Sequence, residues 1–353
     1  MQRTALRSIN SAMNRLQTRS LSSKTAPRHL TSIADLSPAE FTKLVLNASH
    51  YKTAVKSGQT PKSLSNSLAG QTVAMMFNKR STRTRVSTEA AVTIMGGHPM
   101  FLSKDDIQLG VNESLRDTST IISSMTSCMV ARVGAHSDIT GLAEYSSVPV
   151  INALSEDFHP LQTIADFQTI TEALSSQPPG DSSLGLEGLK VAWVGDSNNV
   201  LFDLAIGCIK MGVNIGVAAP TGYGIPDRMR KVILEAGSQV SAPGQLQETT
   251  IPEEAVKDAD IIVTDTWISM GQEAESQARL KAFAGYQVTN ELAKRGGAKP
   301  DWKFMHCLPR HPEEVNDEVF YGPRSLVFEE GENRLWAAVA ALEAFGVNKG
   351  RIL

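Results

Sequence analysis

Short apolar runs alternate with helical stretches along most of this chain, and this pattern restricts the folds open to it. The apolar runs lie at 73–77, 129–133 and 148–152 in the first half, and at 189–196, 213–219, 260–265 and 304–307 in the second. Such alternation is typical of parallel sheets whose faces are covered by the intervening helices. The sequence therefore predicts an α/β fold of two domains, each with a central parallel sheet flanked by helices.

Length and composition agree with this prediction. The chain has 353 residues, of which 41% are hydrophobic and 20% charged, enough to bury two cores. Because no run of 18 apolar residues is present, we expect no membrane-spanning segment. The three cysteines, Cys128, Cys208 and Cys307, are far apart and form no Cys-x-x-Cys pair. This argues against a disulfide framework and a structural metal site, and it favours a reducing compartment.

The first 28 residues differ in composition from the rest. They hold six basic residues, many serines and no acid, since the first acidic residue is Asp35. On a helix, Leu6, Ile9, Met13 and Leu16 would share one side, which gives an amphipathic segment without acids. This is typical of a mitochondrial presequence, so we expect residues 1–28 to direct the protein to the mitochondrial matrix. A basic arm for nucleic acid, or a disordered tail, is the alternative.

Removal of that segment would leave an acidic chain. The whole chain has a formal net charge of −3, and the six positive charges of residues 1–28 leave −9 on the remainder. A chain this acidic has no general attraction for nucleic acid. Affinity for an anion must therefore come from local geometry.

A dense group of hydroxyls and cations follows the first apolar run. Residues 78–85 read Asn-Lys-Arg-Ser-Thr-Arg-Thr-Arg, and a helical pattern begins within them. A helix start presents unpaired backbone N–H groups and the positive end of the helix dipole, so hydroxyls and guanidinium groups there can surround a phosphate. We expect Arg83 to face inward, and Arg80 and Arg85 to pair with acids. A solvated basic turn, the alternative, has no need of the hydroxyl residues between the cations.

Five further motifs accompany this run. They are Val-Ala-Arg at 130–132, His-Pro-Leu-Gln at 159–162, Asp-Thr-Trp-Ile-Ser-Met-Gly at 265–271, His-Cys-Leu-Pro-Arg at 306–310 and Glu-Asn-Arg-Leu-Trp at 332–336. Together with Ser-Thr-Arg-Thr at 81–84, their order and spacing resemble the aspartate and ornithine carbamoyltransferase family over roughly residues 30 to 350. The Ser-Met-Gly and His-Cys-Leu-Pro segments are similar to the ornithine branch of that family.

The resemblance implies an activity and a domain order. The carbamoyl group of carbamoyl phosphate would pass to the δ-amine of L-ornithine, giving L-citrulline and phosphate without cofactor or metal. Residues 29–165 would form the carbamoyl phosphate-binding domain and 166–330 the ornithine-binding domain. Residues 331–353, with a helical pattern at 332–345, would pack back on the first domain and help join the two.

The resemblance also implies roles at the carbamoyl phosphate. Ser81, Thr82, Arg83 and Thr84 are expected to bind the phosphate through side chains and backbone N–H groups. The carbamoyl oxygen, on which negative charge develops, is expected near Thr84, Arg132 and His159. Gln162 would lie at the carbamoyl nitrogen, and Arg334 would bridge the two domains.

Ornithine carries two ammonium groups and one carboxylate, and Asp265 is expected to supply the negative charge. The resemblance places Asn199, Ser269 and the Met270 N–H group around its α-amino and α-carboxylate groups. The Cys307 sulfur and the Leu308 carbonyl would face the δ-amine beside Asp265, align it and accept its proton. The implied catalytic residues are thus Arg132, His159, Asp265 and Cys307. Residues 265–271 include no cation for a second substrate carboxylate, which favours ornithine over aspartate.

One residue implies a shared site. Gln108 matches a family position that reaches the phosphate bound by the neighbouring subunit. The resemblance therefore implies a homotrimer with shared active sites.

Plainer interpretations exist for several of these residues. The turn at 195–200 lacks two of the three glycines of a dinucleotide-binding fingerprint, and no ribose-binding acid follows, so an NAD-dependent enzyme is disfavoured. Asn198 and Asn199 can cap a helix, and so can His159. Arg132 can form an ion pair at the end of a strand, and Cys307 can be a small core residue.

Two other functions stay possible at the level of sequence. One is a carbamoyltransferase that uses another amino acid or amine, and the other is a catalytically silent protein that binds carbamoyl phosphate. An assay for citrulline separates both from the first interpretation.

Overall fold

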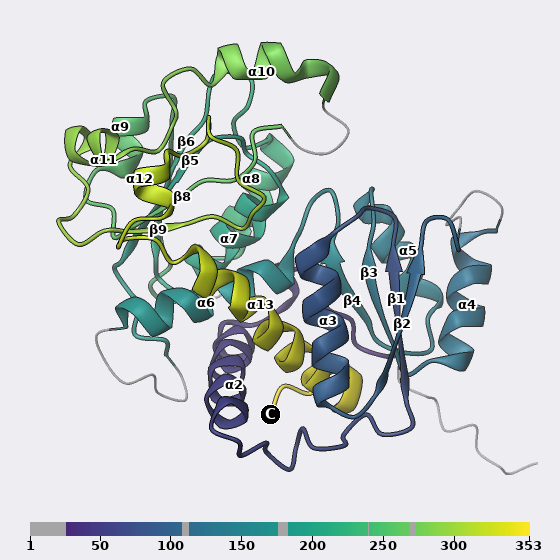
Figure 1. Ribbon diagram of the computed structural model, residues 1–353. Helices are drawn as coiled ribbons and strands as arrows, with labels where there is room; N and C mark the ends of the chain where they lie inside the picture. Colours follow the sequence, from purple (N-terminus) through teal and green to yellow (C-terminus); the bar gives the residue numbers. More distant parts are fainter. Residues whose placement is uncertain (1–25, 108–112, 176–182, 239, 269–272) are drawn as a thin grey trace, which may run out of the picture.

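The computed structural model describes residues 26–107, 113–175, 183–238, 240–268 and 273–353. In it the chain forms two lobes joined by long helices (Figure 1). The expected presequence falls almost entirely outside the described residues, as do Gln108, Ser269 and Met270.

A four-stranded parallel sheet forms the centre of the first lobe, in the order β2-β1-β3-β4. Its strands are β1 (Thr72–Phe77), β2 (His98–Ser103), β3 (Cys128–Arg132) and β4 (Val150–Leu154). They are connected in turn by α3 (Thr82–Ile94), α4 (Leu115–Met125) and α5 (His136–Tyr145). The predicted runs match β1, β3 and β4 to within two residues. The edge strand β2 was not predicted: its short apolar run at 99–102 begins with a proline, which argues against a central strand, and its side chains are half-buried or exposed.

The second lobe is built on a five-stranded parallel sheet, in the order β7-β6-β5-β8-β9. Its strands are β5 (Lys190–Val194), β6 (Asn214–Ala218), β7 (Leu246–Thr249), β8 (Ile261–Val263) and β9 (Lys303–Met305). Its helices are α7 (Asn199–Lys210), α8 (Asp227–Glu235), α9 (Pro252–Val256), η2 (Glu273–Glu275), α10 (Ser276–Ala282), α11 (Asn290–Gly296) and α12 (Asp317–Phe320). The two parallel sheets with flanking helices confirm the predicted fold class.

Each sheet has a point where its strand order reverses. In the first sheet this point lies between β1 and β3, and in the second between β5 and β8. Ligands of open parallel sheets bind outside the carboxyl ends of the strands at such a point. The motifs at 81–84 and 130–132, and the polar residues Asp196 and Asp265, lie at these ends.

The lobes are joined by α6 (Pro160–Leu174) and α13 (Val327–Ala341), with α2 (Pro38–Lys56) beside them. Figure 1 shows α13 running from the second lobe into the first, and it packs against α6, α3 and α2. The largest apolar core continues through both lobes along these helices and includes Phe167 and Trp193. Both expected domain limits, 165/166 and 330/331, fall within α6 and α13 and stay predictions.

The helix starts follow the local sequence in one case and depart from it in another. In α2, the Ser37 hydroxyl accepts from the Glu40 N–H and the Glu40 carboxylate accepts from the Ser37 N–H, a capping box. By contrast, α13 begins at Val327, five residues before the predicted start at 332. Val327 and Glu330 are buried, so tertiary contacts extend this helix through Gly331, which locally disfavours it. After Ala341 it continues as a wider turn over Leu342–Val347.

No helix in the described part of the chain is long and apolar enough to cross a membrane.

Candidate active site

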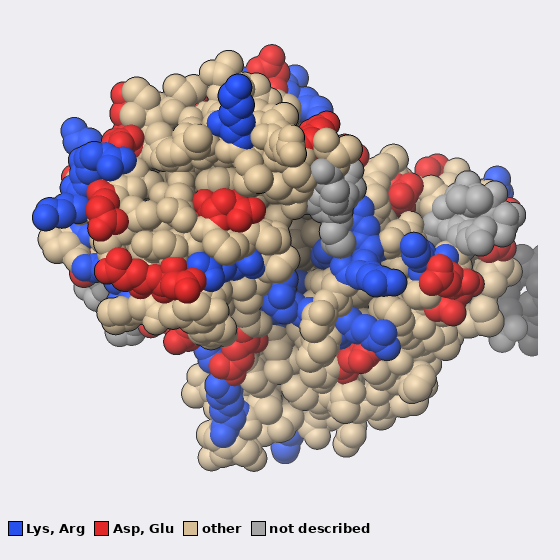
Figure 2. Space-filling model, turned by 45° about the horizontal axis from the view of Figure 1, so that its top comes forward, with Lys and Arg blue, Asp and Glu red and all other residues tan. Residues whose placement is uncertain are grey.

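A cleft of about 1100 Å³ lies between the two lobes. Figure 2 shows basic side chains gathered where the lobes meet and the surface is hollowed. The cleft is lined by every predicted site residue that the structure describes, namely Ser81, Thr82, Arg83, Thr84, Arg132, His159, Gln162, Asn199, Asp265, Cys307, Leu308 and Arg334. The structure therefore brings together residues that are up to 253 positions apart, as from Ser81 to Arg334.

The start of α3 forms the wall of the cleft that faces the second lobe. Ser81 is the N-cap of α3, and its hydroxyl accepts from the Thr84 N–H at 3.3 Å. Arg83 faces the cleft as predicted, and its guanidinium donates to the carbonyl of Leu308 on the opposite lobe. The arginine that is predicted to bind phosphate thus contacts the carbonyl that is predicted to meet the δ-amine.

The other two arginines of this segment differ from each other. Arg85 pairs with Glu89 at 2.9 Å and lies over the Phe101 ring, as the prediction of an acidic partner requires. Arg80 was expected to find such a partner too. It forms no ion pair with any residue of the described ranges and lines the cleft instead, so it is available to an anion.

Three buried groups in the floor of the cleft carry donor atoms without partners. They are Arg132 at the end of β3, His159 just before α6, and Arg334 on α13. Arg132 Nε, His159 Nδ1 and Arg334 Nε have no hydrogen-bond partner among the described residues. Buried polar atoms are nearly always satisfied, so these three are candidates for contact with a ligand.

The electrostatics of this group follow from burial and from like charges. Burial lowers the pKa of Arg132 and of Arg334 to about 10. Burial, with Arg334 and Arg132 nearby, lowers the pKa of His159 well below its usual value. His159 is therefore a neutral imidazole at neutral pH, while both arginines stay charged.

The plainer interpretations of Arg132 and His159 find no support in this geometry. Arg132 forms no ion pair with a described residue, and the His159 side chain makes no cap contact with α6. The backbone N–H of His159 instead donates at 2.8 Å to the Asp203 carboxylate on α7 of the second lobe. Asp203 also accepts from Ser32 and from the Ile33 N–H, so it fixes the turn that carries His159.

Gln162 and Arg334 connect α6, α13 and α3. The Gln162 amide oxygen accepts from Arg334 at 2.6 Å, and the other arm of Arg334 donates to the Thr84 hydroxyl at 3.2 Å. The Gln162 amide nitrogen donates to Asp166 at 2.7 Å and to Glu330 at 2.8 Å. Arg334 thus joins the two helices that connect the lobes to α3 of the first lobe, and its bridging of the two domains stays a prediction.

The opposite wall holds a thiol and a carboxylate in contact. Cys307 Sγ donates to Asp265 Oδ1 at 3.0 Å, and Asn198 Nδ2 donates to Asp265 Oδ2 at 2.8 Å. Burial and the Asp265 charge raise the pKa of Cys307 well above its usual value. Cys307 is therefore a protonated donor at neutral pH, and the acceptor of the pair is Asp265.

Asn198 was not predicted as a site residue. Its side-chain oxygen caps α7 by accepting from the Val200 and Leu201 N–H groups, while its amide nitrogen reaches Asp265. Asn199, which the resemblance implied, lines the cleft and donates to the Ser155 carbonyl at 2.5 Å. Asn198 therefore caps α7 and also contacts Asp265, whereas the Asn199 side chain does not cap the helix.

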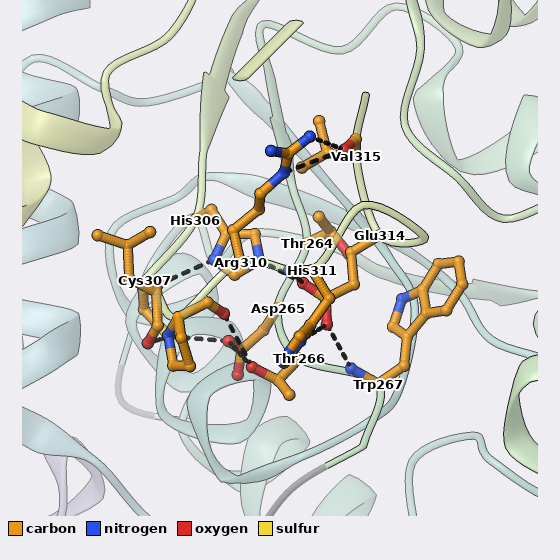
Figure 3. A network of polar contacts seen from close by, with 12 residues as sticks. Thr264, Asp265, Thr266, Trp267, His306, Cys307, Arg310, His311, Glu314 and Val315 are labelled. Carbon is orange, nitrogen blue, oxygen red and sulfur yellow. Dashed lines mark hydrogen bonds and ion pairs between the residues drawn. The ribbon is translucent and has the colours of Figure 1, made fainter. Parts of the chain in front are cut away.

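Figure 3 shows a second set of contacts behind this wall, centred on the buried carboxylate of Glu314. Glu314 contacts His306 Nε2 at 3.0 Å and accepts from the Trp267 N–H at 3.2 Å, so it joins the segments after β8 and β9. His306 Nδ1 accepts from the Leu308 N–H at 2.9 Å, which leaves the proton of a neutral ring on Nε2, facing Glu314. His306 and Glu314 thereby orient the backbone at Leu308, and sequence alone did not indicate this.

A further ion pair supports the segment that follows β8. Arg279 on α10 pairs with Asp196 at 3.1 Å and donates to the Trp267 carbonyl at 2.9 Å. Gly195, just before Asp196, has φ +140°, and a Cβ there would lie 2.7 Å from Trp267 Nε1. The turn after β5 therefore requires glycine because of close packing.

Within the described ranges, no three His, Cys, Asp or Glu side chains are placed to hold a metal.

The two lobes, each with a parallel sheet, and the cleft between them place the chain among two-domain α/β proteins, and comparison with known families narrows this class. The aspartate/ornithine carbamoyltransferase carbamoyl-P binding domain matches residues 28–172, and the Asp/Orn binding domain of the same family matches residues 187–345. The chain belongs to the aspartate/ornithine carbamoyltransferase family, which confirms the resemblance seen in the motifs.

Individual relatives share most of the chain. It is 69% identical over 336 residues to the mitochondrial ornithine carbamoyltransferase of Emericella nidulans, covering 95% of this chain and 94% of that one. With the ornithine carbamoyltransferase of Saccharomyces cerevisiae it shares 49% identity over 333 residues, covering 92% and 95%. The crystal structure of a mitochondrial ornithine carbamoyltransferase from Coccidioides immitis is similar with a TM-score of 0.87 and 66% identity, over 93% of this chain and 100% of that one. The ornithine carbamoyltransferase from Pyrococcus furiosus is similar with a TM-score of 0.81 and 41% identity, covering 90% and 96%.

Proposed function

We propose that this protein is an ornithine carbamoyltransferase, which forms L-citrulline and phosphate from carbamoyl phosphate and L-ornithine. Relatives of that name cover 92–95% of the chain at 49–69% identity. The observation that carries the proposal is the composition of the cleft: buried nitrogen atoms without partners in its floor, and the Asp265 and Cys307 pair on the wall opposite α3. This reaction serves arginine biosynthesis and the urea cycle.

Phosphate binds at the start of α3. Ser81, Thr82 and Thr84 offer hydroxyls and N–H groups there, and Arg83 offers a guanidinium. Because Arg83 contacts the Leu308 carbonyl, its movement to the phosphate also frees that carbonyl. Binding of the first substrate thus prepares an acceptor for the amine of the second.

The carbamoyl oxygen gains negative charge when the amine attacks. Arg132, neutral His159 and Thr84 supply donors to that oxygen, and the Arg132 charge stabilises it most. Removal of one such donor typically costs about 2.7 to 4 kcal/mol of transition-state stabilisation. Gln162 accepts from the carbamoyl –NH₂ group, and Arg334 holds Gln162 and Thr84 in place.

The δ-amine must lose a proton to attack the carbonyl carbon. Asp265 accepts that proton, and the Cys307 thiol and the Asn198 amide orient its carboxylate by donating to it. The Leu308 carbonyl accepts a hydrogen bond from the amine. This contact points the lone pair of the amine nitrogen toward the carbonyl carbon of carbamoyl phosphate. The bond from that carbon to the phosphate oxygen then breaks, and phosphate leaves. Asn199, Ser269 and the Met270 N–H group bind the α-amino and α-carboxylate groups of ornithine.

The protein acts as a homotrimer in which Gln108 of one subunit contacts the phosphate bound by the next. This proposal follows from the family position that Gln108 matches. Apolar side chains are exposed on both lobes, for example Met125 on α4 and Phe328 on α13, and the trimer would cover those at its interface. Sedimentation equilibrium of the chain without residues 1–28 should give about three times its monomer mass, and a fully active monomer would contradict the shared site.

The protein acts in mitochondria. The relatives from Emericella nidulans and Coccidioides immitis are named mitochondrial, and the first 28 residues have the composition of a presequence.

Substrate choice tests the proposed function. The chain without residues 1–28, given carbamoyl phosphate, should form citrulline from ornithine with kcat/KM at least about a hundredfold above that for aspartate, acetylornithine or putrescine, since each of these leaves polar groups of the site unpaired. Arg83→Ala serves as the impaired control. Carbamoylation of another amine in place of ornithine would contradict the specificity, and tight binding of carbamoyl phosphate without turnover would indicate a silent binding protein.

A further inference from the structure

Two buried carboxyl groups lie in contact below the floor of the cleft, where α6 and α13 cross. Asp166 is 3% exposed and Glu330 is 2% exposed, and the two are within hydrogen-bonding reach of each other. Burial raises the pKa of Asp166 to about 7 and the pKa of Glu330 well above its usual value. Contacting buried carboxyl groups do not both ionise, so the pair retains one shared proton near neutral pH.

Both groups accept from the same amide. Gln162 Nε2 donates to Asp166 Oδ1 at 2.7 Å and to Glu330 Oε1 at 2.8 Å, while Gln162 Oε1 accepts from Arg334 at 2.6 Å. If the amide were reversed, its oxygen would face two carboxyl oxygens and its –NH₂ group would face a guanidinium. The reversed orientation is therefore excluded, and the oxygen of Gln162 lies on the side of Arg334.

The hydrogen bonds that the four carboxyl oxygens of Glu330 and Asp166 accept indicate which group carries the shared proton. Glu330 uses one oxygen to accept from Gln162 and the other to accept from the His306 N–H at 2.9 Å. Asp166 uses Oδ1 to accept from Gln162. Both oxygens of Glu330 thus act as acceptors, whereas no described residue donates to Asp166 Oδ2. A proton on Asp166 Oδ2 therefore leaves all of these contacts intact.

We propose that Asp166 and Glu330 are positioning residues that turn the Gln162 amide oxygen toward the substrate, so that the cleft selects a carbamoyl group over an acyl group without N–H. A carbonyl oxygen has two lone pairs, and Arg334 uses one of them. The second is available to the –NH₂ group of carbamoyl phosphate. Acetyl phosphate presents a methyl group at the same place and leaves that lone pair unpaired. The inference rests on the proposed function, since it concerns the group bound by Gln162.

Three variants of the chain separate this role from a general need for charge or packing. Glu330→Gln turns one of two required acceptors into a donor, which then faces an N–H group of Gln162 or of His306. Asp166→Ala removes both the acceptor for Gln162 and the proton for Glu330. Asp166→Asn is the matched conservative variant, because its amide still accepts with oxygen and donates with nitrogen.

The readouts are KM for carbamoyl phosphate with saturating ornithine, and the inhibition constants of acetyl phosphate and of inorganic phosphate. Glu330→Gln should raise KM for carbamoyl phosphate by about thirtyfold, as expected when buried donors lose their acceptor. Asp166→Ala should raise it by about tenfold, and Asp166→Asn should restore it to within about threefold of the starting value. Both inhibition constants should change by less than about threefold in all three variants, so the preference for carbamoyl over acetyl phosphate falls.

Equal losses in Glu330→Gln and Asp166→Asn would overturn the proposal, since they would indicate a need for charge alone. So would a loss of acetyl phosphate affinity equal to that of carbamoyl phosphate. If Glu330→Gln does not fold, the two Asp166 variants decide, and failure of asparagine to restore what alanine loses contradicts the inference. A chain that forms no citrulline would fail the proposed function, whereas calorimetric binding of carbamoyl and acetyl phosphate would still test the orientation of Gln162.

Discussion

Asp265→Asn is expected to lower kcat by at least about a thousandfold, within the range by which a positioned general base accelerates a reaction. The carboxylate accepts from Cys307 Sγ and from Asn198 Nδ2, one on each oxygen. An amide of the same size offers one oxygen, so its –NH₂ group must face one of these two donors. The variant also loses the charge that attracts the δ-ammonium group, so KM for ornithine should rise as well. Steady-state kinetics with both substrates measure both effects.

Cys307 supplies the matched control for this prediction. The thiol donates to Asp265, and the raised pKa keeps it protonated. Cys307→Ser retains a donor at the same place and should cost less than about tenfold in kcat, whereas Cys307→Ala removes the donor and should cost more. Inhibition by inorganic phosphate, whose proposed site is on the other wall, should change little in any of the three variants. An Asp265→Asn enzyme with a tenth or more of the original kcat would show that another group accepts the proton.

The parts of the fold that follow local rules could be predicted from sequence. Fully buried parallel strands such as β1 and β3 read as continuous apolar runs, and a helix such as α6 begins at a proline and ends where its periodicity ends. The edge strand β2 has only a short apolar run that begins with a proline, and its side chains are half-buried or exposed. The start of α13 depends on the burial of Val327 and on the contacts of Glu330 with Gln162 and His306, and sequence placed it too late.

The site divides in a similar way. Several residues that we propose to contact the ligand stand at strand ends and belong to family motifs, so Arg132, Asp265 and Cys307 could be predicted from sequence. The residues that hold these side chains in place could not be predicted from sequence. Glu314 and Glu330 are acids in a polar stretch of sequence, and only tertiary packing buries them against His306. An exposed glutamate and a buried glutamate that accepts hydrogen bonds can have the same neighbours in sequence. One sequence alone therefore does not show which of the two a given glutamate is.

Burial also decides protonation, which sequence does not contain. The sequence interpretation allowed Cys307 to accept a proton from the amine. In the structure the thiol is surrounded by Asp265 and apolar groups, and its raised pKa makes it a donor. The same argument makes His159 neutral, because the nearby guanidinium groups and the lack of solvent both oppose a second charge there.

Arg132→Leu is expected to lower kcat by at least about a hundredfold while the affinity for inorganic phosphate changes only a few-fold. The reason is that Arg132 acts on the carbamoyl oxygen, whose charge develops in the transition state, and phosphate alone does not present that oxygen. Kinetics with both substrates and inhibition by phosphate give the two numbers. Equal losses in kcat and in phosphate affinity would show that Arg132 binds phosphate instead.

The stability of this variant provides an independent measurement. Arg132 is buried, its Nε has no partner among the described residues, and Arg334 and Arg83 repel it. A buried charge without a paired acid destabilises the folded state, and sites that stabilise a transition state commonly contain such groups. Arg132→Leu should therefore unfold at the same temperature as the original protein or at a higher one, despite its lost activity. A clear fall in the unfolding temperature would mean that Arg132 has a structural partner, and the loss of kcat would then no longer assign it to the carbamoyl oxygen.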